Sequence, residues 1–81
     1  MKVLFGAVAA EAFAELPQSA KRKAASSIEL LEQHPRMYPV RKRGLMRGYR
    51  YFAAGRHLVY YSVNSQEVRI TAIIPGAMGR A

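Results

Sequence analysis

The stretch that decides the fold is GYRYFAAGRHLVYYSV, which spans residues 48–63. Its first part, residues 49–53, is rich in aromatic side chains and leads into Ala54-Gly55, a pair suited to a tight turn. Its second part, residues 57–63, consists mostly of aliphatic and aromatic residues, which favour extended backbone. The sequence therefore predicts two strands joined by a hairpin.

Two further strands are expected outside this stretch. Residues 68–74 read VRITAII and stop at Pro75, and the short apolar run at residues 2–5 forms the other strand. Simple alternation of side chains along residues 68–74 puts four residues on one face of the sheet: Val68, Ile70, Ala72 and Ile74.

Between the first strand and the hairpin, the apolar spacing changes to that of helices. Pro17 divides the region into two helices, and the residue pair His34-Pro35 ends the second near Gln33. The apolar stripe of the first helix is Ala9, Ala12, Phe13 and Leu16, and that of the second is Ala20, Ala24, Ile28 and Leu31. We therefore expect a single α+β domain over residues 1–81. It has a short strand, a helical hairpin and a three-strand antiparallel meander, with the helices on one face of the sheet.

Composition narrows the range of functions. The chain has 81 residues and is 51% hydrophobic, so it can fold around a core. It contains no cysteine, and its two histidines show no ligand-like spacing to an acidic residue. We therefore expect no metal and no cofactor. The absence of any apolar run of about 18 residues indicates a cytoplasmic protein that does not enter a membrane.

The charge is strongly basic and unevenly placed. Thirteen Lys and Arg residues face five acidic residues, which gives a net charge of +8. Seven of the basic residues and none of the acidic ones lie within residues 36–56. Such a block suits nucleic acid or an acidic protein segment, although a merely solvated basic surface is the plainer alternative. The residues expected to make this contact are Arg41, Lys42, Arg43, Arg47 and Tyr49.

The order of these motifs resembles the RelE/ParE superfamily, the toxins of bacterial type II toxin–antitoxin systems. The resemblance rests on the glycine–aromatic–arginine strand at Gly48-Tyr49-Arg50, the Gly55 turn with its aliphatic–tyrosine strand, the closing strand of residues 68–74, and a hydrophobic helix that ends at Pro35. It implies a cognate antitoxin in a hetero-oligomer, which lays an acidic and apolar segment over the basic surface. It also implies a cellular target, either DNA gyrase or the ribosome with its mRNA.

If the protein is an mRNA endonuclease like RelE, three residues are candidates for the chemistry. Arg50 would contact phosphate, with Arg56 and His57 in or near the site, because RNA cleavage needs proton transfer and charge stabilisation. Each also has a structural interpretation: Arg50 in a surface salt bridge, Arg56 as a solvated turn residue, and His57 as a residue that only opens a strand. Many family members carry a histidine directly after the last strand and an arginine two places later, where this chain has Pro75 and Ala77.

This poor catalytic inventory favours a ParE-like toxin that binds DNA gyrase. The first helix, cut short at Pro17, instead resembles compact RelE-like members, so a ribosome-dependent mRNA endonuclease remains the alternative. A non-toxic, basic nucleic-acid-binding module is a further alternative.

Overall fold

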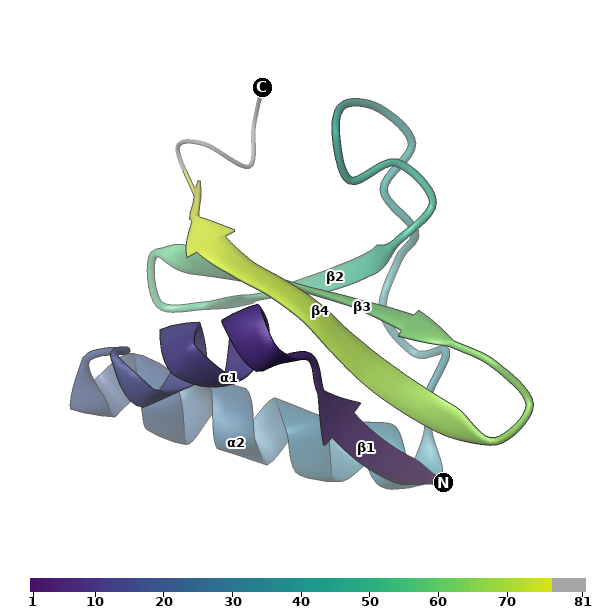
Figure 1. Cartoon of the computed structure of the whole chain (residues 1–81), viewed down its shortest axis with the longest axis horizontal. Coiled ribbons are helices and arrows are strands. Elements are labelled where there is room, and N and C mark those ends of the chain that lie inside the picture. The colour runs from purple at the N-terminus through teal and green to yellow at the C-terminus, as the bar shows by residue number, and fades with distance from the viewer. Residues whose placement is uncertain (77–81) are drawn as a thin grey trace.

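The computed structural model describes residues 1–76 and confirms the predicted α+β class. Its elements are β1 (Lys2–Phe5), α1 (Ala7–Ala14), α2 (Gln18–Gln33), β2 (Arg50–Ala54), β3 (His57–Val63) and β4 (Glu67–Pro75). The strand order in the sheet is β1-β4-β3-β2. β1 pairs with β4 in parallel, whereas β2, β3 and β4 form the predicted antiparallel meander. Both helices lie on the same side of this sheet (Figure 1).

Prolines set the limits of the longer helix, as the sequence predicts. Pro17 is the N-cap of α2, where its missing N–H costs no hydrogen bond, and its carbonyl oxygen accepts from the Lys21 amide at 2.9 Å. At the other end, His34 leaves helical geometry immediately before Pro35.

Small side chains let the helices approach the sheet closely. Ala9, Ala20 and Ala24 are buried in the core that the helices share with the sheet. The turn between β2 and β3 packs against α2, because a Cβ on Gly55 would lie 3.3 Å from the Cβ of Ala20. Gly55 also has a φ of +62°, so both the space and the backbone conformation favour glycine here. The sheet contributes six large side chains to this core: Phe52, Val59, Tyr61, Val68, Ile70 and Ile73.

The predicted facing of β4 is wrong in its second half because of a β-bulge. Tyr61 pairs with Ile70, but its neighbour Tyr60 pairs with Ala72, so Thr71 is an extra residue in β4. The extra residue reverses the alternation that follows it. Ile73 therefore points into the core in place of Ala72 and Ile74, which face away from the helices.

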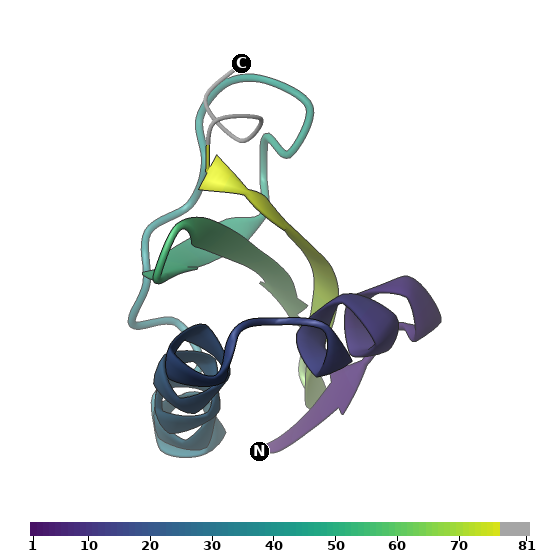
Figure 2. The same cartoon turned by 90° about the vertical axis from the view of Figure 1, so that its left-hand side faces the viewer.

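The connection from α2 to β2 passes around the β2 edge and reaches the face of the sheet opposite the helices (Figure 2). It is attached to that edge by a β-bridge between Val40 and Arg50 and by the Tyr51 amide, which donates to the Pro39 carbonyl at 3.1 Å. β2 begins at Arg50, one residue later than predicted. Among residues 1–76, no helix has the length and apolar character needed to cross a bilayer.

Candidate functional site

Residues 41–48, named the basic loop below, form an ordered projection. Its two ends are joined by the Gly48 amide, which donates to the Arg41 carbonyl at 2.8 Å, and by the Arg41 amide, which donates to the Tyr49 carbonyl at 2.7 Å. Gly44 and Gly48 have φ values of 87° and 94°, a region that residues with a side chain rarely occupy. These two glycines allow the chain to reverse tightly and return to β2.

Arg41 connects the basic loop to the sheet. Its Nη1 atom donates to the Tyr60 hydroxyl at 3.1 Å, and its Nε atom donates to the Arg43 carbonyl at 3.0 Å. The guanidinium also lies 5.9 Å from the centre of the Tyr51 ring, within the range of a cation–π contact. Tyr51 and Tyr60 in turn pack together with ring centres 5.8 Å apart. Arg41, expected to bind a partner, therefore also holds the loop in place.

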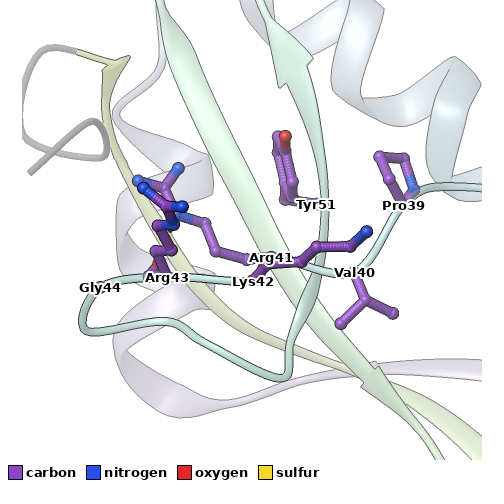
Figure 3. Close-up of a pocket in the computed structure, with 7 residues that line it drawn as sticks. All are labelled: Pro39, Val40, Arg41, Lys42, Arg43, Gly44 and Tyr51. Atoms are coloured by element: carbon purple, nitrogen blue, oxygen red, sulfur yellow. Dashed lines mark hydrogen bonds between the residues drawn. The ribbon is translucent and has the colours of Figure 1, made fainter.

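A pocket of about 600 Å³ lies between the basic loop and β2. Its wall is formed by residues 39–44, which run into the basic loop, and by Tyr51 (Figure 3). Lys42 and Arg43 are exposed beside it, and Arg47 is exposed further along the loop. Within residues 1–76 the structure shows one salt bridge, between Arg69 and Glu67 at 2.8 Å, so no ion pair neutralises these three residues. The pocket and its surroundings therefore form a positively charged surface.

The tyrosines around this site are all at least half-buried. Tyr60 and Tyr61 are both fully buried, on opposite faces of the sheet as alternation predicts, and Tyr49 and Tyr51 are half-buried. The outer face is covered at this point because Arg41 and Tyr51 pack over Tyr60. Stacking of a base on Tyr60 would first require the Arg41 contact to break.

Tyr61 has a hydroxyl in an unusual environment. Among residues 1–76 its Oη atom is buried and has no hydrogen-bond partner. This burial raises the pKa of Tyr61 above its ordinary value of 10.0, and the Tyr38 backbone amide and the nearby Arg50 charge offset the increase only in part. The folded protein therefore holds the Tyr61 proton more tightly than the unfolded chain does.

We expect Tyr61→Phe to remove a pH dependence from the free energy of unfolding. The wild-type contribution of this group is complete below pH 10 and is lost as the pH rises through the higher folded-state pKa. At neutral pH the variant should be as stable as wild type or about 1 kcal/mol more stable, since it removes an unsatisfied hydroxyl. Urea unfolding between neutral pH and pH 11 measures both effects. A clear loss of stability at neutral pH would show that the hydroxyl has a partner.

Arg50 faces the helix side of the sheet, where it lies opposite Tyr61. Its guanidinium donates to two main-chain carbonyl oxygens in the connection before β2, at 2.7 Å to Tyr38 and 3.2 Å to Arg36. The structure thus shows neither the surface salt bridge nor an arginine presented with the basic loop. Arg50 instead fastens the segment that leads into the basic loop.

The other two candidates for chemistry lie at the opposite end of β2. Arg56 is exposed in the hairpin turn, and its carbonyl accepts from the Gly76 amide at 2.7 Å. His57 pairs with Ala54 and so faces the helices, with a buried Nδ1 atom that finds no partner among residues 1–76. Four steps along the backbone of β2 separate Arg50 from Ala54 at this end, a distance of about 13 Å. Arg50 therefore does not share a site with Arg56 and His57.

Two further expectations concern positions near the end of the chain and metal binding. Pro75 is the last residue of β4, whereas Ala77 lies outside the described residues. In the described part of the chain, no three side chains of the His, Cys, Asp or Glu type are grouped so that they could hold a metal ion.

Sequence reasoning found the basic residues of the loop but missed the contact of Arg41 with Tyr51 and Tyr60. It also missed Leu45, a fully exposed residue at the loop tip. The two glycines that flank the tip were the available signal for a projecting turn.

Comparison with known proteins agrees with this fold. The model of the family described as ParE toxin of type II toxin-antitoxin system, parDE, matches residues 5–79. One similar solved structure is the archaeal RelE-RelB complex from Pyrococcus horikoshii OT3, with a TM-score of 0.75 at 23% identity; the match covers 99% of this chain and 97% of that one. Another is the chromosomal ParDE TA system from P. aeruginosa, with a TM-score of 0.71 at 16% identity and coverage of 93% and 95%. A comparison with curated protein sequences gave no significant match.

The two structural likenesses establish the fold, which is the one expected of the RelE/ParE superfamily. The family match spans nearly the whole chain, from β1 to beyond β4. This chain belongs to the ParE toxin family of type II toxin–antitoxin systems.

Proposed function

We propose that this toxin acts on DNA gyrase by binding it, and that a cognate antitoxin neutralises it by covering the basic loop. The observation that carries the proposal is the separation of the candidate catalytic residues. Arg50 donates to main-chain carbonyls at one end of β2, and His57 faces the helices at the other end. RNA cleavage needs a base, an acid and charge stabilisation around one phosphate, so this arrangement favours a binding role.

The antitoxin contact is supported by charge and shape. The pocket beside the basic loop is open and surrounded by cationic side chains, which suits an acidic and apolar segment. A disordered segment that folds on binding can cover such a surface and mask it. The solved relatives are described as a RelE-RelB complex and a ParDE system, in keeping with a toxin–antitoxin hetero-oligomer. Action on gyrase places the protein in the cytoplasm.

The proposal predicts inhibition of gyrase without cleavage of messages. Purified toxin should bind gyrase and inhibit its supercoiling activity, and added antitoxin should restore that activity. In cells without antitoxin, induced toxin should stop growth while mRNA 5′ ends, mapped shortly after induction, stay unchanged. New cuts inside translated reading frames would instead establish the mRNA endonuclease. Normal growth with intact messages would contradict both toxin mechanisms.

A further inference from the structure

Leu45 at the tip of the basic loop is the most exposed large hydrophobic residue of the described chain. Its side chain is 100% exposed, whereas the other exposed large hydrophobic residues range from 38% to 74%. Full exposure of a leucine gains nothing for the fold, because burial is what makes an apolar side chain stabilising. The side chain is therefore available to a partner.

The loop that presents Leu45 is held by hydrogen bonds within it and at its base. Inside it, the Arg47 amide donates to the Gly44 carbonyl at 3.2 Å, and the Tyr49 amide donates to the Met46 carbonyl at 3.1 Å. The base of the loop is attached to the sheet through Arg41 and Tyr60. A preformed loop loses little conformational entropy on binding, so an apolar anchor on it contributes more of its burial to affinity.

Cationic side chains surround this apolar tip. Lys42, Arg43 and Arg47 are exposed on either side of Leu45, and no salt bridge within residues 1–76 involves them. The complementary surface is an apolar hollow with acidic groups around its rim. Such an arrangement has the usual form of a protein interface, an apolar centre within a polar rim.

The shape of the projection distinguishes between classes of partner. An antitoxin segment that inserts in the pocket beside Tyr51 would be the convex partner, and a single extended or helical segment would offer no hollow for a projecting leucine. Single-stranded nucleic acid is bound through stacking on aromatic rings, and the tip residues Leu45 and Met46 have none. A folded protein with a surface pocket is the partner that fits.

We infer that the basic loop is a docking knob for the folded protein that this toxin inhibits, with Leu45 inserted in an apolar, acid-rimmed pocket of that protein. The inference rests on the proposed function in that it requires a protein target. It adds the residue that anchors the contact and the chemistry of the site that receives it.

The test compares Leu45→Ser with two controls. Leu45→Met keeps an apolar side chain at the tip, and Val8→Ser removes another exposed apolar residue, 74% exposed on α1, on the helix side of the sheet. Binding of each protein to purified gyrase is measured, with growth arrest in antitoxin-free cells and affinity for the antitoxin as further readouts. Leu45→Ser should bind gyrase at least about tenfold more weakly and arrest growth less. Val8→Ser should behave as wild type, Leu45→Met should keep most of the gyrase binding, and Leu45→Ser should lose less affinity for the antitoxin than for gyrase.

The outcomes separate this inference from the proposed function. If the wild-type protein binds gyrase and Leu45→Ser binds it equally well, the docking knob is overturned and the gyrase proposal stands. Failure of the wild-type protein to bind gyrase overturns the gyrase proposal. In that case, a docking knob for another protein is supported if Leu45→Ser no longer arrests growth while Leu45→Met still does. It is overturned if Leu45→Ser arrests growth as the wild-type protein does. The inference is also overturned if Leu45→Ser loses affinity for the antitoxin alone. It is overturned as well if the wild-type protein cleaves mRNA and Leu45→Ser retains that cleavage.

Discussion

Arg50→Ala should abolish growth arrest while the protein still folds. The variant loses both hydrogen bonds to the carbonyls of Arg36 and Tyr38, which fasten the segment before the basic loop. Hydrogen bonds from a charged group contribute roughly 1.5–3 kcal/mol each in protected sites, and part of this contact is exposed. The free energy of unfolding should therefore fall by about 2 kcal/mol in total. In a domain of this size that lowers Tm by roughly 8–16 °C. The core between the helices and the sheet does not depend on Arg50 and should remain.

The loss of activity should come from the loop and not from missing chemistry. Amide exchange at Arg41 and Tyr51, whose hydrogen bonds join the loop base to β2, should become faster in Arg50→Ala. Arg50→Lys can reach only one carbonyl at a time and should restore part of the activity. Arg69→Ala is the matched control, a strand arginine whose only salt bridge in the described chain is the exposed one to Glu67, and it should keep growth arrest. Full toxicity from a folded Arg50→Ala protein would rule out this role.

Replacing Arg41, Lys42 and Arg43 together with alanine should weaken antitoxin binding by roughly 100-fold, at about 1 kcal/mol for each charge removed. The dependence of affinity on salt should also become shallower, because fewer charges are brought together in the complex. Titration calorimetry at several salt concentrations measures both effects.

The chain contains its own control for this prediction. Lys21, Arg22 and Lys23 on α2 form a second basic run, and their replacement changes net charge by the same amount on the helix side of the sheet. Because Arg41 also holds the loop through Tyr60, a Lys42→Ala/Arg43→Ala double variant separates charge from loop position. Equal effects of the two triple variants would mean that overall charge, and not the basic loop, determines antitoxin affinity.

Local patterns in the sequence were sufficient for most of the fold. Alternation and turn residues predicted β3 with its correct ends, and Pro17 and Pro35 limited α2 as expected. The bulge at Thr71 carried no local signal, because neither a glycine nor a proline marks it. Its position depends on how β3 and β4 pair with each other, and one extra residue was enough to reverse the facing of Ile73 and Ile74.

The site was harder to predict because its contacts join residues far apart in the chain. The basic character of the loop was visible in the sequence. The bond from Arg41 to Tyr60 spans 19 residues, and that from Arg50 to Tyr38 spans 12. No periodic pattern reports such contacts. Arg50 therefore looked like a free strand arginine when its guanidinium is engaged by main-chain oxygens.

The position of β4 has a consequence for synthesis on the ribosome. β4 lies between β1 and β3 in the sheet, yet it is the last to be made of the six elements described in residues 1–76. Among the described strands β1 pairs with β4 alone, so it stays without that partner for some sixty residues of synthesis, until Glu67 and the residues after it have been made. The nascent chain thus has no complete sheet, and its helices have no finished surface to cover, until translation is nearly past β4. The surface that carries the basic loop therefore cannot take its final form before β4 is available to pair with β1 and β3.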